Sequence, residues 1–68
     1  MRPKYFWLKE RHNPQLGVYW VTMGNITLEK ARAHENAMYG TNYMHKFSTE
    51  KEYEEKIAQL IANGERVS

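Results

Sequence analysis

Apolar and polar side chains alternate along two early segments, residues 4–12 and 17–23, which are rich in aromatic and β-branched residues. A period of two residues with this composition is typical of β-strands that bury one face. Between the two segments, Asn13 and Pro14 favour the start of a turn, and Gly17 can adopt the positive φ that closes one. The pattern therefore predicts a β-hairpin.

The length of the hairpin loop decides which side chains share a face of the sheet. A four-residue loop, Pro14–Gly17, would pair Asn13 with Val18. This register predicts an apolar core face made of Phe6, Leu8, Tyr19, Val21 and Met23. The opposite face would be aromatic and basic, with Tyr5, Trp7, Lys9, Arg11, Val18, Trp20 and Thr22. A change of one residue in the loop would mix the two sets.

A weaker apolar periodicity follows the hairpin and predicts a helix over residues 28–39. Thr27 is a suitable N-cap, and Gly40 can end the helix in the left-handed conformation. The apolar face is interrupted by Glu35 and is thin, consisting of Leu28, Ala31, Met38 and Tyr39. We therefore expect a shallow, half-exposed crossover helix.

Residues 43–47 form a third predicted strand, and residues 49–63 carry the clearest helical pattern of the chain. Thr49 and Glu52 match a capping box, a pattern that marks the start of a helix. The apolar positions of this segment recur three and four residues apart, at Tyr53, Ile57, Leu60 and Ile61. This spacing predicts an amphipathic helix with one buried face.

The predicted element order is β-β-α-β-α, in one α+β domain over residues 1–68. If the third strand returns beside the first, the sheet is antiparallel with strand order 2-1-3. We expect two layers, with both helices on one face of the sheet and the other face open to solvent or to a partner. A domain of this length buries only about 60% of its unfolded surface, so we expect no deep cavity and no small-molecule substrate.

Composition and charge add three points to this picture. The chain has no Cys, which excludes disulfides and thiolate metal sites. The apolar run at residues 5–8 is too short for a signal peptide or a membrane span, so we expect a cytoplasmic protein that does not act on membranes. The formal charge of +2 is unevenly placed: residues 1–24 carry four basic residues against Glu10, and residues 48–68 carry three against five Glu.

Residues with catalytic or metal-binding chemistry are few and scattered. His12, His34 and His45 are the only imidazoles, and no two of them have the spacing of a zinc motif. Catalysis needs a nucleophile, a base and an orienting group, and no spacing of the Ser, Thr, His and Glu residues selects such a set. The four Gly are spread along the chain and form no phosphate-binding loop. We therefore predict a protein that is not an enzyme and has no cofactor or metal.

The aromatic and basic face of the hairpin is the predicted binding surface. Two Trp side chains exposed together would form an apolar patch of the kind that marks interaction sites. The predicted partner-binding residues are Tyr5, Trp7, Lys9, Arg11, Val18 and Trp20. In the alternative interpretation, the Trp side chains pack across the pleat against each other, or one of them belongs to the core.

The expected partner is a protein or a second copy of the chain, because interface cores favour Tyr, Trp, Met and Arg. In size the chain is similar to small accessory or inhibitor proteins of bacteria and their phages. Single-stranded nucleic acid or DNA is the alternative partner, since bases stack on aromatic rings and phosphates bind Lys and Arg. The modest positive charge places this alternative second.

Overall fold

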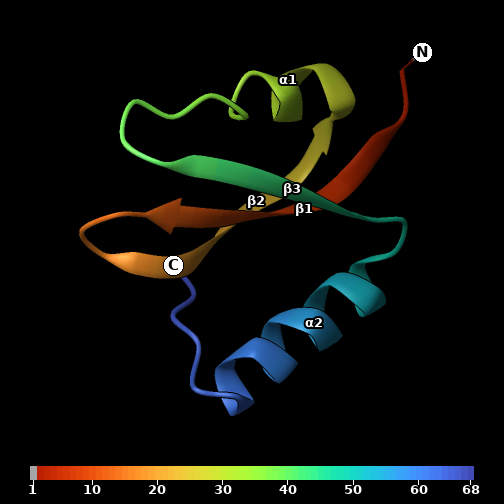
Figure 1. Ribbon diagram of the computed structural model, residues 1–68. Helices are drawn as coiled ribbons and strands as arrows, with labels where there is room; N and C mark the ends of the chain where they lie inside the picture. Colours follow the sequence, from red (N-terminus) through yellow and green to blue (C-terminus); the bar gives the residue numbers. More distant parts are fainter. Residues whose placement is uncertain (1) are drawn as a thin grey trace.

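The computed structural model describes residues 2–68 as a three-stranded sheet with two helices (Figure 1). Along the chain the elements are β1 Lys4–Asn13, β2 Gly17–Thr27, α1 Leu28–Arg32, β3 Thr41–Phe47 and α2 Glu50–Ala62. β1 pairs antiparallel with both other strands, in the order β2-β1-β3. The predicted α+β class, antiparallel sheet and strand order are confirmed.

The turn between β1 and β2 is one residue shorter than predicted. Asn13 pairs with Gly17, which leaves a three-residue loop. The side-chain Oδ1 of Asn13 accepts hydrogen bonds from the backbone N–H groups of Gln15 (2.8 Å) and Leu16 (2.9 Å). These bonds stabilise the tight turn. The predicted register is therefore wrong by one residue in the half of the hairpin next to the turn.

A β-bulge in β2 reverses this shift farther along the hairpin. Leu8 pairs with Thr22, whereas Trp7 pairs with Gly24, so Met23 is the extra residue. Beyond the bulge, toward the N-terminal end of β1, the pairing is again the one that the four-residue loop predicted.

Between the short turn and the bulge, the side chains of β2 point to the faces opposite to those predicted. Because side chains alternate between faces, a shift of one residue moves every side chain of the segment to the other face. Trp20 therefore lies on the face of Leu8, not on the face of Trp7 as predicted. The residues exchanged between the faces are Val18, Tyr19, Trp20, Val21 and Thr22.

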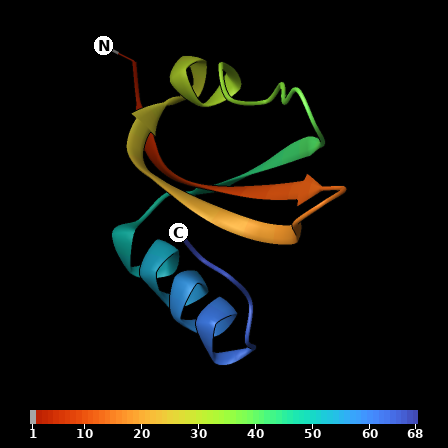
Figure 2. The ribbon, with the colours of Figure 1, turned by 90° about the vertical axis from the view of Figure 1, so that its left-hand side faces the viewer.

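The main core lies between the Leu8 face of the sheet and α2 (Figure 2). Its buried members are Leu8, Trp20, Tyr53 and Leu60, and the partly buried side chains around them are Phe6, Phe47, Ile57 and Val67. α2 begins after the predicted N-cap Thr49, whose Oγ1 accepts a hydrogen bond from the Glu52 N–H (3.2 Å). The predicted apolar face of α2 is confirmed except at Ile61, which is 60% exposed.

α1 is much shorter than predicted and ends at Arg32 instead of Tyr39. Thr27 is its N-cap, as expected, and accepts a backbone hydrogen bond through Oγ1. Beyond Arg32 no large apolar side chain occurs until Met38, so no packing against the sheet can stabilise further helical turns. Residues 33–40 instead form a loop that leads to β3.

The two helices lie on opposite sides of the sheet, with α1 above it and α2 below it (Figures 1 and 2). The sequence pattern instead predicts both helices on one face. Trp7 and Leu8 are consecutive, so they point to opposite faces, and both are buried. Each face therefore needs its own cover, and the buried Ala31 of α1 lies on the Trp7 side.

The segment after α2 runs along the free edge of β2. Trp20 donates its backbone N–H to the Arg66 carbonyl (2.8 Å) and accepts from the Ser68 N–H (2.8 Å). The Thr22 N–H also donates to the Ser68 carbonyl (3.1 Å). Val67, between them, packs against the main core. This C-terminal segment covers the β2 edge, and β3 forms the other edge of the sheet.

Candidate interaction surface at the hairpin end

The six predicted partner-binding residues do not form one surface. Tyr5, Trp7, Lys9 and Arg11 lie on the α1 side of the sheet. Val18 and Trp20 lie on the α2 side, because the register of this part of β2 differs from the predicted one. The prediction that all six share a face is therefore wrong.

Trp20 belongs to the main core. Its side chain is 6% exposed, and its indole Nε1 donates a hydrogen bond to Oε1 of Glu65 (3.1 Å). The His45 ring lies against it, with 4.9 Å between ring centroids, and Lys56 Nζ lies 5.6 Å from its centroid. Each polar and apolar part of this side chain is thus used within the protein.

Trp7 is also buried, on the opposite side of the sheet. Its side chain is 4% exposed, and Nε1 donates to the Ile26 carbonyl (3.0 Å). Tyr5 packs edge-on against it, with 6.4 Å between centroids. The prediction of two exposed indoles is wrong. The alternative that a Trp belongs to the core holds for Trp20, and Trp7 is buried separately beneath the α1 side.

Arg11, predicted as a partner-binding residue, has a structural role in the protein. Its guanidinium donates to Oδ1 of Asn42 (3.0 Å) and to the Tyr39 carbonyl (3.2 Å). Asn13 donates to the same carbonyl through Nδ2 (3.1 Å). Two β1 side chains therefore hold the end of the loop 33–40 against the sheet.

Most exposed apolar side chains gather at the hairpin end of the molecule. Among residues 2–68, seven large apolar side chains are exposed, and Leu28 and Ile61 lie elsewhere. The other five are 49–85% exposed and are Leu16, Val18, Met38, Tyr39 and Tyr43. We call these five residues the tip surface.

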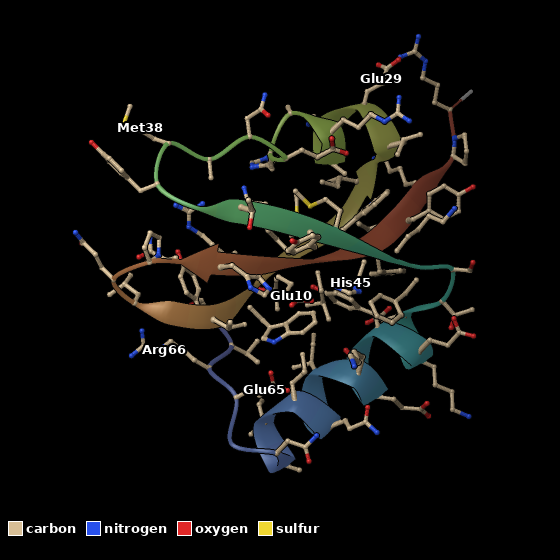
Figure 3. All side chains as sticks on the ribbon, viewed as in Figure 1. Glu10, Glu29, Met38, His45, Glu65 and Arg66 are labelled. Atoms are coloured by element: carbon tan, nitrogen blue, oxygen red, sulfur yellow. The ribbon has the colours of Figure 1, made fainter. Side chains whose placement is uncertain are left out.

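The tip surface comes from three segments that meet at the end of β1. Val18 pairs directly with His12, and the ring of Tyr43 in β3 lies 5.0 Å from the His12 ring. The loop reaches the same place, because Gly40 lies against the His12 backbone. Figure 3 shows Met38 at the outer end of this loop, away from both helices.

Hydrogen bonds fix the backbone that carries the tip surface. Beside the bonds from Arg11 and Asn13, the Asn42 Nδ2 donates to the His34 carbonyl (2.6 Å). Gly40 has φ +129°, and a Cβ at this position would overlap the His12 carbonyl oxygen. Only glycine permits this close approach without a shift of the backbone.

Glu10 forms a polar cluster with two His side chains on the α2 side of the sheet. Its Oε2 lies 2.5 Å from Nε2 of His12, and its Oε1 lies 2.9 Å from Nε2 of His45. Glu10 and His45 are labelled near the middle of Figure 3. Partial burial acts to raise the pKa of Glu10, but hydrogen bonds and charge from the two His outweigh it, so the pKa lies below its usual value.

The geometry of this cluster is that of a carboxylate between two hydrogen-bond donors. A carboxylate only accepts, so each imidazole presents a hydrogen on Nε2 to it. Within residues 2–68, no three His, Cys, Asp or Glu side chains are arranged to hold a metal ion.

Basic side chains are concentrated on the α1 side of the sheet. The sheet itself contributes Lys9, Arg11 and Lys46, and α1 contributes Lys30 and Arg32. Most acidic side chains belong to α2 and the segment after it, at Glu50, Glu52, Glu54, Glu55 and Glu65. Beside α1, a shallow groove of about 220 Å³ is lined by Lys9, Val21, Thr22, Met23, Ile26, Lys30 and His34.

Comparisons with family models, with curated proteins and with solved structures found no match to this chain. Within residues 2–68, no helix is long and apolar enough to cross a membrane. The physical features of the surface therefore carry the functional argument.

Sequence reasoning missed Met38 and Tyr39 as surface residues because it assigned both to a helix. A signal against that helix was present: Arg32, His34, Glu35 and Asn36 leave no apolar side that could pack on the sheet. Two large apolar residues after such a polar stretch, directly before a glycine, indicate an exposed loop.

Proposed function

We propose that the protein is a small non-enzymatic binding protein that docks its tip surface on another protein. The grouping of five exposed apolar side chains at one end of the molecule supports this proposal. Scattered exposed apolar residues are normal, whereas exposed apolar side chains gathered in one region of the surface indicate an interaction site. Met and Tyr are residue types that interface cores favour.

The fixed backbone of the tip surface is a second argument. Binding costs less conformational entropy when the contact residues are already ordered. Asn13 fixes the turn that carries Leu16, and Arg11 and Asn13 together fix the backbone at Tyr39. These hydrogen bonds join backbone groups and the polar side chains of Arg11 and Asn13. The apolar side chains of the tip surface take no part in them, so they remain available to a partner.

The partner proposal is tested by affinity capture with the full chain and two variants. The double variant Met38→Glu/Tyr39→Glu places charge on the tip surface without changing any side chain that fixes the loop. We expect it to weaken capture of the partner at least about 30-fold, which corresponds to roughly 2 kcal/mol for loss of an interface hot spot. Binding is measured by titration of the captured partner.

Ile61→Glu is the control, because Ile61 is also exposed (60%, against 85% for Met38 and 68% for Tyr39) but lies on α2. It should bind as the unchanged protein does, and nuclease treatment should not alter capture. Equal loss of binding by both variants, or capture that persists in the tip variant, would overturn the proposal.

Nucleic acid is a second candidate partner, and the unequal charge of the two sides of the sheet favours it. Lys9 and Lys30 line one groove on the basic α1 side, at a distance from the acidic α2. Single-stranded nucleic acids bind grooves that follow their backbone with positive charge. Both Trp rings are buried, however, so the stacking surface originally expected for bases is absent from the described residues 2–68. The protein partner therefore remains the first proposal.

A further inference from the structure

The two edges of the sheet differ in how they are covered. The C-terminal segment forms hydrogen bonds along β2 at Trp20 and Thr22. β3 pairs with β1 on one side, and no other strand of the described residues 2–68 pairs with its outer side. In Figure 1, β3 is the strand of the sheet nearest the viewer, and no segment lies across it. An uncovered edge presents unpaired backbone groups that favour pairing with another strand.

The hydrogen bonds of the C-terminal segment reveal which β3 backbone groups point outward. The N–H groups of Trp20 and Thr22 point away from β1, toward that segment. Backbone groups alternate in direction along a strand, so Tyr19 and Val21 bond to β1 through their partners Arg11 and Lys9.

The same alternation along β1 extends the argument to β3. Since Lys9 and Arg11 bond to β2, their neighbours Leu8 and Glu10 bond to β3. The β3 residues paired with these even-numbered positions are Thr41, Tyr43, His45 and Phe47. The backbone groups that point to the open edge therefore belong to Asn42, Met44 and Lys46.

We propose that β3 pairs antiparallel with β3 of a second copy of this chain, about a two-fold axis at Met44. The backbone directions suit this arrangement, because Met44 is central among the three outward-pointing residues. Met44 would exchange two hydrogen bonds with Met44 of the second copy, and Asn42 would exchange two with Lys46 of the second copy. About six hydrogen bonds would join the copies. Tyr43 belongs both to this edge and to the tip surface, whereas the tip proposal is tested at Met38 and Tyr39, which lie outside β3.

The side chains of β3 are complementary to themselves in this register. Lys46 lies opposite Asn42 of the second copy, so no like charges meet directly. On the α2 side, Tyr43 lies opposite His45, and the pairing would cover part of the 53%-exposed Tyr43 ring. An isologous contact of this kind closes with two copies.

β3 also lacks the features by which proteins block an open edge. Its seven residues, Thr41–Phe47, contain no Pro, and its pairing with β1 has no bulge. Lys46 is its only Lys, and it lies at one end of the strand, where it extends over the Tyr5 ring (4.6 Å to the centroid). Pairing is therefore opposed neither by backbone shape nor by charge at the centre of the edge.

The test is sedimentation of the full chain over a wide concentration range, together with hydrogen exchange of single amides. We expect the mass to rise from that of an 8.1 kDa monomer to twice that value. The Asn42, Met44 and Lys46 amides should become protected as the dimer forms. The Tyr43 and His45 amides should be protected at every concentration, because they bond to β1.

Two variants separate dimer loss from unfolding. Met44→Glu places two carboxylates opposite each other in the dimer, whereas in the monomer the new side chain lies beside Lys9. Met44→Pro removes an N–H that only the dimer uses. Both should weaken association at least tenfold and keep the circular dichroism of the unchanged monomer, and Ile61→Glu should dimerise normally.

A monomeric mass at every concentration would overturn the proposal. So would a dimer that both Met44 variants leave intact, or one in which protection appears at Tyr43 and His45 instead. Binding of a partner by the tip surface is measured with Met38 and Tyr39 variants, so either proposal can fail while the other holds.

Discussion

Single polar side chains hold the loops of this protein to its sheet. Arg11 and Asn13 share the Tyr39 carbonyl, and Asn42 links β3 to the loop through the His34 carbonyl. A hydrogen bond of this type contributes about 1 kcal/mol net to stability. Together these bonds order a loop whose apolar side chains have no core to pack in.

Glu10 makes stability depend on pH in the acid range. Its pKa is lowered when the protein folds, so the unfolded chain binds the proton more tightly. The stabilisation is therefore complete above the ordinary value of about 4.5 and is lost as the pH falls through the lower pKa of the folded protein. We expect Glu10→Gln to cost about 1 kcal/mol at neutral pH, because Gln offers only one acceptor oxygen to two imidazoles.

Urea denaturation at a series of pH values checks this prediction. The difference between the unchanged protein and Glu10→Gln should disappear near the acid end of the series. Glu54→Gln, on an exposed position of α2, should show no such pH dependence. A loss of stability from Glu10→Gln that stays constant with pH would contradict the assignment.

At the scale of elements, the order β-β-α-β-α and α2 could be predicted because each has a local signal, and the strand order followed from the rule that the third strand returns beside the first. Thr49 and the spacing of Tyr53, Ile57 and Leu60 are sufficient to place α2. The hairpin faces could not be predicted, because they depend on whether the loop has three or four residues and on whether β2 contains a bulge. Each of these changes the register by only one residue. The candidate site was missed for that reason and because the sequence pattern predicts a helix over residues 28–39, which includes Met38 and Tyr39.

Gly40 is the position at which the loop depends most on one residue. Gly40→Ala would force a Cβ against the His12 carbonyl at a positive φ, and we expect a loss of about 2 kcal/mol or more. Gly64→Ala is the matched control: its φ is also positive, at +79°, but nothing lies near the new Cβ. It should cost only about 1–2 kcal/mol, from the left-handed backbone alone.

Chemical denaturation of both glycine variants measures the difference. A larger loss for Gly40→Ala reports the close approach of the loop to β1. Equal losses would mean that the loop moves away from β1 at little cost.

At the scale of the whole molecule, basic and acidic side chains are unevenly divided between the two sides of the three-layer fold. α1 and the sheet face below it carry five of the ten basic residues, and α2 with the segment after it carries five of the eight acidic ones. A polyanion approaching the protein would therefore meet attraction on one side and repulsion on the other. This arrangement provides a direct test of the nucleic-acid alternative.

If single-stranded nucleic acid binds the groove beside α1, the logarithm of its affinity should fall linearly with the logarithm of salt concentration. Lys9→Glu/Lys30→Glu should weaken binding at least tenfold and make this slope shallower, as measured by fluorescence anisotropy. Lys51→Glu is the control, because it makes the same change of charge at one site on α2, away from the groove, and should leave binding unchanged. Arg11 is unsuitable for this purpose, because its substitution would also release the loop.

The bulge at Met23 compensates for the short turn, so the one-residue shift in register is confined to residues 18–22. The pairing on either side of this segment does not determine which face of the sheet its side chains occupy. Adding one residue to the turn while deleting Met23 would leave both ends of the hairpin in place and move only the side chains of residues 18–22 to the opposite face. Trp20 would then leave α2 and move to the side of α1. The short turn and the bulge at Met23 thus decide whether the Trp20 indole packs on the side of α2 or on the side of α1.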